Sequence, residues 1–518
     1  MASVAHPMTR PLPVVAPRLL PLLALGLLTA AAVVKHLHAL DAGYWIDEGI
    51  SVGISSHHLT AIPGVLRQDG SPPLYYVLLH IWMAVFGSAP VATHALSVVF
   101  AVAAVPAAYW AIAPLSAGGG LVAAAILALD PFVGLYADET RMYSLVLLLS
   151  VIVCGFFLRA LVLRRRGAAV PLALALALAL LLYTHAWGAF LAAAAGVAWL
   201  ALVAIGPHRR ELLRTGAIAF GGALALFAPW VPTLLYQARH TAAPWSHRPS
   251  LTSLTTAMTR MGSGQRPELI LFALLVVGAV FAFVRGGVGS RTGVLSFAML
   301  AAGALLGAWA YSRYGSPAWA LRYLVVVLGP LALLVGLAAG RIPVVGPVTV
   351  LVVLGVGVLL WYGRPTERSL ENKSNVAAAA ARLGPLLPRG TLVFSTQPEQ
   401  VPNLAHYLPR GMQFVTPMGR VPDARVFDWR DALRRLHAAD YAAVLGQAVR
   451  SLHPGQRLLL VQPHFSHPDS PWTLGIRAIA RHWGRLLRRG GGLRQIAVVR
   501  PRRGSSRSTV VETLLERR

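Results

Sequence analysis

Two acidic residues stand side by side near the amino end of the chain, Asp47 and Glu48 in the stretch Y-W-I-D-E-G. Further acids follow in D-G-S-P-P-L-Y-Y, which contains Asp69, and in D-E-T-R-M-Y-S, which contains Asp138 and Glu139. A carboxylate can accept the proton of a hydroxyl group as that group attacks, and cations stabilise a phosphate that leaves. The acids therefore indicate transfer of a group from a phosphate donor to a hydroxyl, if cations lie near them.

Cationic, imidazole and phenolic side chains follow at the ends of apolar runs farther along the chain. They are Arg141, Tyr143, His185, Arg322 and Tyr323. Each has a simpler explanation, because an arginine at a membrane boundary can extend toward lipid headgroups and a histidine there can be satisfied locally. For each acid, taken alone, a solvated loop residue is the better explanation. Their predicted grouping on one membrane face favours a phosphate-binding pocket.

The composition places these residues in a membrane protein. Of the 518 residues, 56% are hydrophobic and 13% are charged, and the mean hydropathy is +0.61, which lies outside the usual range for soluble proteins. Apolar runs of about 20 residues recur over the first two thirds of the chain, as a bilayer requires. The net charge of +27 comes largely from arginines in short loops and near the carboxyl end, so we expect anionic lipid and no nucleic acid as a partner. The single cysteine, Cys154, excludes disulfides and cysteine-based metal sites within the chain.

The distribution of arginine between loops predicts how the chain crosses the membrane, since short cytoplasmic loops carry the excess positive charge. Arginine-rich loops occur at 164–166, at 208–214 and around Arg285, and the amino end holds Arg10 and Arg18. If all of these face the cytoplasm, an even number of spans precedes residue 164. We expect about eleven spans, at Leu19–Leu37, Val91–Ala113, Leu121–Leu135, Ser144–Leu163, Pro171–Tyr183, Ala186–Ile205, Gly216–Tyr236, Leu269–Val284, Val294–Ala310, Leu321–Gly340 and Val344–Trp361.

The apolar run Pro72–Phe86 would make the number of spans before residue 164 odd, and it is short for a span. We therefore expect it to form a helix along the membrane surface, within a first external loop that covers residues 39–90. Its aromatic residues Tyr75, Tyr76 and Trp82 suit that interface. By this topology the candidate acids lie on the external side of a plasma membrane.

A separate domain is predicted after the last span. Thr391–Ser395 and Gln413–Thr416 have the composition of strands, and Glu399–Tyr407 between them has that of a short helix, which makes a β-α-β pattern. Tyr441–Leu445 and Leu458–Val461 are candidates for further strands. We expect a transmembrane domain over residues 1–362, a small α/β domain over 363–476 on the external side, and a basic tail over 477–518 that is mobile or held against lipid headgroups.

Five motifs, taken in order, carry a resemblance to a known family. They are W-x-D-E from Trp45, D-G-x-P-P-L-Y-Y from Asp69, D-E-T-R-M-Y-S-L from Asp138, L-L-Y-T-H-A-W-G-A-F from Leu181 and L-R-Y-L from Leu321. In this order they resemble the GT-C class of membrane glycosyltransferases, in the branch of the polyprenyl-phosphate-mannose protein mannosyltransferases and the aminoarabinose transferases. The resemblance spans residues 39–340 and implies the GT-C fold, with a membrane-parallel helix in the first external loop.

The resemblance also implies roles for individual residues. Asp47 would be the catalytic base, and Glu48 its partner, which orients it or binds the acceptor. Arg141 would bind the donor phosphate. Ser71 stands where the protein mannosyltransferases have a histidine, which weakens the case for a protein Ser or Thr as acceptor and removes one candidate phosphate or metal ligand. The remaining residues of the expected donor and substrate site are Asp69, Asp138, Glu139, Tyr143, His185, Arg322 and Tyr323.

The implied reaction is an inverting transfer of a sugar, with mannose favoured, from a polyprenyl-phosphate donor to a glycan, lipid or protein hydroxyl of the cell envelope. Inverting displacement needs only one base, so Asp47 suffices. No cofactor is required, although the external acids would be compatible with a divalent cation. Two alternatives stay open: a lipid or glycolipid transporter or flippase without covalent chemistry, and an assembly partner that binds glycan. A transporter would show broken helices, charges at mid-span and repeated halves, whereas the charges here gather at one face.

Overall fold

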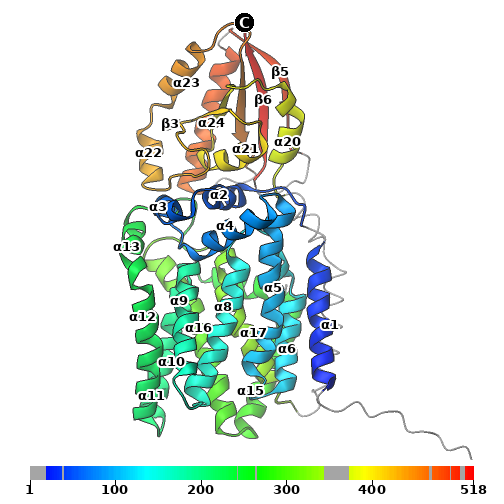
Figure 1. Cartoon of the computed structure of the whole chain (residues 1–518), viewed down its shortest axis with the longest axis vertical. Helices are drawn as coiled ribbons and strands as arrows, with labels where there is room; N and C mark the ends of the chain where they lie inside the picture. The colour runs from blue at the N-terminus through cyan, green and yellow to red at the C-terminus, as the bar shows by residue number, and fades with distance from the viewer. Residues whose placement is uncertain are drawn as a thin grey trace, which may run out of the picture.

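The computed structural model describes residues 19–37, 40–241, 243–262, 265–342, 373–465, 469–489, 492–501 and 508–518. Most of its helices form an upright bundle, and a domain built around a β-sheet sits on one end of that bundle (Figure 1). A layer of short helices, α2 to α4, lies between the bundle and the sheet domain. The architecture therefore has three parts: bundle, connecting layer and sheet domain.

The bundle is made of apolar helices, because a helix satisfies its own backbone hydrogen bonds and so can lie in lipid. Among the described residues, six helices are long and apolar enough to cross a membrane, and the bent pair of α6 and α7 adds a seventh if it forms one span. The helices are α1 (Leu19–His36), α5 (Pro90–Ile112), α6 (Ala117–Leu129), α7 (Pro131–Ala137), α8 (Tyr143–Phe157), α9 (Ala169–Thr184), α10 (Gly188–Ile205), α11 (Arg209–Gly216), α12 (Gly222–Phe227), α13 (Val231–His240), α14 (Thr252–Met261), α15 (Gln265–Val284), α16 (Val288–Tyr314) and α17 (Val325–Ala339).

The predicted spans fall on these helices, except for Val344–Trp361, which lies outside the described residues. Some are short: the apolar parts of α1, α9 and α15 have 10–17 residues each. The predicted span Leu121–Leu135 is bent by 56° between α6 and α7. Asp130 caps α7 there by accepting a hydrogen bond of 2.7 Å from the amide of Phe132, and Pro131 cannot continue the ladder of α6. The chain is a multi-pass membrane protein, and the number of eleven spans stays a prediction.

Two of the arginine-rich loops meet at one end of the bundle. Arg164, after α8, forms an ion pair with Glu211 in α11, with 3.5 Å between Nη1 and Oε2, so two arginine-rich loops lie together. Figure 1 places α11 at the end of the bundle that is farthest from the sheet domain. The predicted catalytic acids lie at the other end, next to the sheet domain. This separation agrees with the charge-based topology, and which end is external stays a prediction.

Glycine residues allow α6 and α17 to approach each other closely. A Cβ atom on Gly119 would lie 2.6 Å from the carbonyl oxygen of Gly336, and one on Gly336 would lie 2.5 Å from that of Gly119. Any side chain at either position would push the two helices apart, and small residues commonly serve this purpose in membranes. The packing matters for the site because α17 continues from the 3₁₀ turn Leu321–Leu324, which carries Arg322 and Tyr323.

The connecting layer consists of α2 (Ile46–Ser55), α3 (Ile62–Asp69) and α4 (Leu74–Phe86). The predicted surface helix corresponds to α4, which crosses the end of the bundle in Figure 1. Its orientation relative to a bilayer stays a prediction. The expectation that Tyr75 and Tyr76 lie at a lipid interface is wrong, because both rings are fully buried. Tyr76 donates a hydrogen bond of 3.4 Å to Asp69, so this face of α4 packs toward the candidate site.

The sheet domain has six strands in the order β3-β2-β1-β4-β6-β5. The predicted β-α-β unit is present, because β1 pairs in parallel with both β2 and β4. The carboxyl-terminal strands β5 and β6 extend the sheet in antiparallel fashion. The strands are β1 (Leu392–Ser395), β2 (Gln413–Thr416), β3 (Gly419–Arg420), β4 (Arg457–Pro463), β5 (Leu493–Val499) and β6 (Val510–Arg517), and the main helices are α20 (Val376–Leu383), α21 (Val401–Tyr407), α22 (Ala432–Ala438), α23 (Tyr441–Arg450) and α24 (Pro471–Arg489).

Two expectations about this domain are wrong. Tyr441–Leu445 is not a strand but the first half of α23, since the side chain of Asp440 caps a helix there by accepting the amide hydrogen of Ala443 at 2.9 Å. Residues 477–518 are not a free basic tail, because they include most of α24 and the strands β5 and β6. The buried side of α24 repeats at helical spacing through Trp472, Ile476, Ile479, Trp483 and Leu487, while most of its arginines face outward.

Candidate active site

A cavity of about 200 Å³ lies where the bundle, the connecting layer and the sheet domain meet. It gathers six of the residues that the sequence singled out, although they come from segments that are far apart in the chain. These are Asp47, Asp69, Arg141, His185, Arg322 and Tyr323. The rest of the wall includes Trp187, Trp245, Ser71, Thr241 and, from the sheet domain, Trp429.

Asp47 is the second residue of α2, whose first turn begins after Trp45. A helix amino terminus favours a negative charge, so the backbone itself stabilises the carboxylate at this position. One carboxylate oxygen lies 3.7 Å from Nη2 of Arg322, and the side chain is 19% exposed toward the cavity. Asp47 therefore presents an oriented carboxylate to any molecule that enters.

Arg141 lies in the short loop between α7 and α8, and its guanidinium group reaches toward α2 and α4. Its Nη1 donates to the carbonyl oxygen of Asp47 at 3.3 Å, to Oγ of Ser51 at 3.0 Å and to the hydroxyl of Tyr76 at 3.5 Å. The side chain is 8% exposed and lines the cavity. This guanidinium is therefore fixed beside Asp47, where it can donate to a phosphate group.

Arg322 supplies the second guanidinium group and is held between aromatic rings. Its Cζ atom lies 4.5 Å from the ring centre of Trp245 and 5.8 Å from that of Trp45. Cation–π contacts of this kind orient an arginine and leave its hydrogen-bond donors free to bind an anion. The cavity thus holds two cationic groups near a single oriented carboxylate.

His185 joins α9 to α10 and adds a neutral donor to the wall. Its Nδ1 accepts a hydrogen bond of 3.0 Å from the amide of Trp187, which places the proton of a neutral ring on Nε2. Burial, together with the charges of Arg141 and Arg322, lowers the pKa of His185 to about 3. The ring packs 4.7 Å from that of Tyr323, measured between centres. His185 can therefore donate a hydrogen bond without adding a third charge.

Asp69 closes the cavity from the end of α3. Its carboxylate accepts a hydrogen bond from Tyr76, and burial raises its pKa. The chain turns directly after it at Gly70, where φ is +97° and a Cβ would lie 2.6 Å from Oγ1 of Thr241. Only glycine fits both conditions without strain. Gly70 therefore fixes the close approach of Asp69 to the loop that carries Thr241.

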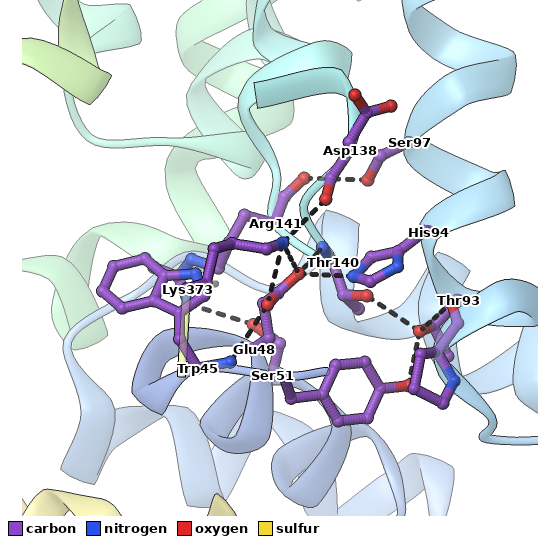
Figure 2. A network of polar contacts seen from close by, with 12 residues as sticks. Trp45, Glu48, Ser51, Thr93, His94, Ser97, Asp138, Thr140, Arg141 and Lys373 are labelled. Carbon is purple, nitrogen blue, oxygen red and sulfur yellow. Dashed lines mark hydrogen bonds and ion pairs between the residues drawn. The ribbon is translucent and has the colours of Figure 1, made fainter. Parts of the chain in front are cut away.

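Glu48 does not line the cavity, so of its two expected roles the geometry favours orienting Asp47 over binding the acceptor. Its side chain is fully buried on another side of α2. It accepts hydrogen bonds from the amide of Trp45 at 3.1 Å, from the amide of Thr140 at 2.8 Å and from Nε2 of His94 at 2.6 Å. Lys373 completes the set with an ion pair of 3.1 Å (Figure 2). The pKa of Glu48 is well below its usual value, because Lys373 and His94 outweigh the opposing effect of burial.

Three other predicted site residues are near the cavity but do not line it. Asp138 pairs with Nδ1 of His36 at 3.2 Å, on the side of α1. Glu139 is 1% exposed. Tyr143 is buried behind the wall, with its ring 5.7 Å from Cζ of Arg141. These residues support the loop that carries Arg141, and direct contact with substrate is not indicated for them.

The site offers few ligands for a metal. Among the residues that the structure describes, no group of three or more His, Cys, Asp or Glu side chains could hold an ion. The two carboxylates of the cavity are engaged, Asp47 with Arg322 and Asp69 with Tyr76. A divalent cation needs several oxygen ligands, so these residues do not fit one well.

The sequence reasoning missed Lys373, His94 and the tryptophans Trp245 and Trp429. A signal for Lys373 was present: of the 46 Lys and Arg residues only two are lysine, Lys35 and Lys373. Both are directed at the segment around α7, Lys35 at the carbonyl oxygen of Asp130 and Lys373 at that of Asp138, each at 2.8 Å. His94 and the tryptophans carried no such signal, since the tertiary fold alone brings them to the site.

No protein-family model and no curated protein matches the sequence. Solved structures do match the fold. ArnT from Cupriavidus metallidurans bound to undecaprenyl phosphate is 13% identical, with a TM-score of 0.62, and the match covers 96% of this chain and 98% of that chain. AglB from Archaeoglobus fulgidus, in complex with an inhibitory peptide and a dolichol-phosphate, is 9% identical, with a TM-score of 0.54 and coverage of 86% and 69%.

The arabinofuranosyltransferase AftD from Mycobacteria is 14% identical, with a TM-score of 0.52, and the match covers 95% of this chain but 41% of that larger one. All three are glycosyltransferases of the GT-C class. The chain has the GT-C fold. Because the match with ArnT covers nearly all of both chains, the GT-C likeness includes the sheet domain as well as the bundle. With sequence identities of 9–14%, the likeness concerns the fold alone and does not assign roles to single residues.

Proposed function

We propose that the protein is an inverting glycosyltransferase that moves a sugar from a polyprenyl-phosphate donor to a hydroxyl group. The observation that carries the proposal is the cavity itself, in which Asp47 lies between the guanidinium groups of Arg141 and Arg322. One oriented carboxylate and two fixed cations match the needs of a displacement at a glycosyl phosphate.

In the proposed reaction the acceptor oxygen attacks the anomeric carbon, and Asp47 accepts the proton of the attacking hydroxyl. A new bond forms between that carbon and the acceptor oxygen, while the bond from the carbon to the phosphate oxygen breaks. The electron pair goes to the departing polyprenyl phosphate. Arg141, Arg322 and the Nε2 proton of His185 stabilise the charge that develops on it, through charge-assisted hydrogen bonds.

The donor is proposed from the chemistry of the wall and from the fold. Two of the structural relatives hold undecaprenyl phosphate or dolichol-phosphate, and both share the GT-C fold with this chain. Mannose is the sugar that we favour, on the resemblance of the motifs. The reaction would need no metal, since the arginines can neutralise the single phosphate group.

The acceptor is proposed to be a hydroxyl of the cell envelope, on a glycan, a lipid or a protein. Trp429 brings an aromatic residue from the sheet domain to the cavity wall, which also includes Trp187 and Trp245. Aromatic rings offer a flat apolar face with a polar edge, which suits the alternating apolar and hydroxylated surface of a sugar. Of the three acceptor classes, glycan, lipid and protein, the tryptophans of the cavity wall favour a glycan.

The test is transfer of labelled mannose from polyprenyl-phosphate mannose in membranes that contain the protein. Asp47→Asn should lower the rate by about 10²- to 10⁴-fold, because the base is lost while the shape is kept. Glu211→Gln, which removes an exposed acid at the opposite end of the bundle, is the matched control and should leave the rate unchanged. Full activity of Asp47→Asn would refute the assignment of the base. Transfer of another sugar but not mannose would refute only the choice of sugar.

The active site and the sheet domain are proposed to face the outside of a plasma membrane. The support is the clustering of arginine-rich loops at the opposite end of the bundle, since such loops stay in the cytoplasm. A topology reporter fused after Arg518 should therefore report an external location. A cytoplasmic signal would contradict this part of the proposal.

A further inference from the structure

Lys373 has no role in the reaction proposed above, yet it is one of only two lysines in the chain and is almost fully buried. It is the first described residue of the sheet domain, and its side chain is 3% exposed. Burying an ammonium group is costly unless ionic and hydrogen-bond partners compensate. The partners of Lys373 therefore indicate what the residue is for.

The ammonium group uses its donors on two partners from the membrane part of the protein. It donates to both oxygens of Glu48, at 3.1 and 3.2 Å, and to the carbonyl oxygen of Asp138 at 2.8 Å. Glu48 belongs to α2 and Asp138 to the loop that leads to Arg141. Lys373 thus connects the sheet domain with the two segments that carry Asp47 and Arg141.

Glu48 joins these segments to each other as well. Its carboxylate accepts the amide hydrogen of Thr140, the residue before Arg141, and a hydrogen bond from His94 on α5 (Figure 2). The Nδ1 atom of His94 faces the carbonyl oxygen of Leu40 at 2.8 Å. Both nitrogens of this ring therefore lie within hydrogen-bond distance of oxygen atoms, which holds the ring between Glu48 and Leu40.

Glu48 and Thr140 each stand next to a residue that takes part in the proposed reaction. Asp47 precedes Glu48, and Arg141 follows Thr140, so the hydrogen bond between Glu48 and Thr140 sets how α2 lies against the loop of Arg141. A second bond, from Arg141 to the carbonyl oxygen of Asp47, spans the same junction. If Glu48 loses its charge or its place, both Asp47 and Arg141 can shift relative to each other.

We propose that Lys373 is a positioning residue that holds Glu48 in place and thereby fixes Asp47 against Arg141, so that sugar transfer requires the docked sheet domain. This inference rests on the proposed function for its effect on catalysis. The predicted structural effect, a loosened junction between α2 and the loop of Thr140, does not depend on that function.

The groups that surround Glu48 make the proposal testable by pH. The carboxylate faces the ammonium group of Lys373, the imidazole ring of His94, and phenols whose pKa is raised by burial and which are therefore neutral. These phenols are Tyr44, Tyr75 and Tyr407. Removing Lys373 takes away the ammonium group that stabilises the buried carboxylate, so Glu48 will take up a proton at a higher pH than in the wild type. The network then fails at a pH where the wild type is intact.

The experiment compares pH–rate profiles of the full-length protein with those of Lys373→Met. For Lys373→Met we expect at least a tenfold lower rate at pH 8 and a donor KM within threefold of the wild type. The acid limb of the profile, the pH range in which the rate falls as the pH is lowered, should move up by more than one pH unit. The double variant Glu48→Gln/Lys373→Met has no carboxylate at position 48 to take up a proton, so its acid limb should return to the wild-type position. Lys35→Met, which removes the other lysine of the chain, a half-buried one, is the control and should not move the limb.

Hydrogen exchange separates this proposal from the proposed function. In Lys373→Met the amides of Thr140 and Trp45, which both bond to Glu48, should exchange at least tenfold faster. Unchanged exchange at Thr140, an unmoved acid limb, or a rate loss that only follows a lower unfolding temperature would each overturn the positioning role. A wild type without any transfer activity, together with faster exchange in the variant, would overturn the proposed function and leave the structural coupling standing.

Discussion

Glu512 provides a prediction whose size follows from the structure. This carboxyl group lies in β6 on the buried face of the sheet, next to Val510 and Leu514, and is 0% exposed. Neither of its oxygens has a hydrogen-bond partner among the residues that the structure describes. Burial raises the pKa of Glu512 to about 8 from an ordinary value of 4.5. The folded protein should therefore hold a proton here that the unfolded chain releases above about pH 4.5.

The sign of the pH dependence follows from proton binding. Between about pH 4.5 and pH 8 the folded state binds more protons than the unfolded state, so stability falls as the pH rises and becomes constant above pH 8. At about 1.4 kcal/mol for each pH unit, the full cost is about 5 kcal/mol, of which about 3 kcal/mol falls between pH 6 and pH 9. For a domain of this size that loss corresponds to about 5 to 10 °C in unfolding temperature.

The assay is thermal unfolding of the purified full-length protein in detergent at pH 6 and pH 9, followed by the fluorescence of the buried residues Trp472 and Trp483. Glu512→Gln cannot ionise and should lose most of the difference between the two pH values. Glu516→Gln is the matched control on the same strand, since Glu516 is ion-paired with Arg494 at 2.8 Å and should keep the wild-type slope. A wild type whose unfolding temperature is equal at both pH values, or a Glu512→Gln variant that keeps the slope, would refute the reasoning.

Four further predictions concern the site and the sheet domain. Arg141→Met should raise the donor KM by about 10- to 100-fold, because charge-assisted hydrogen bonds to the donor phosphate are lost. Arg164→Met, at the opposite end of the bundle, should leave the donor KM unchanged. A donor KM of Arg141→Met equal to that of the wild type would show that Arg141 does not bind the donor. Trp429→Ala should raise the acceptor KM at least tenfold with the donor KM unchanged in steady-state assays, and the reverse pattern would place Trp429 at the donor. Activity should persist in EDTA, because the arginines replace a metal, and a loss that Mg²⁺ or Mn²⁺ restores would contradict this. Truncation after Arg489 removes β5 and β6 and should lower the unfolding temperature by at least about 10 °C; an unchanged value would mean that these strands do not stabilise the domain.

Much of the bundle was predictable from sequence because long apolar runs have few other solutions in a membrane. The parallel β-α-β unit around β1 was predictable for a similar reason, since short runs of apolar residues alternated with turn signals. The segment 477–518 was not, because its arginines dominate the composition and hide the buried stripe of α24, which shows only when Trp472, Ile476 and Trp483 are placed on a helix. Charge indicated a solvated tail, and helical periodicity was the better guide.

The candidate site shows a different limit of sequence reasoning. The predicted site residues stood out as polar groups near span ends, and the fold brings six of the ten together in the cavity. Tyr75 and Tyr76 were misplaced, since an aromatic residue near a membrane end suits a lipid interface and a buried site equally well. What decides between the two is which face of α4 meets the bundle, and packing against segments distant in sequence determines that face.

The pair Asp47 and Glu48 illustrates the same point within a single turn of helix. Neighbouring residues on an α-helix project about 100° apart, so two adjacent acids point in different directions. Which of them does so depends on where α2 begins and how it is rotated, and the capping bond from the amide of Trp45 to Glu48 fixes both. Glu48 turns inward to Lys373 and His94, and this leaves Asp47 facing Arg322. The buried acid of the pair therefore sets the direction of the exposed one, which is why loss of Glu48 should impair transfer although Glu48 does not line the cavity.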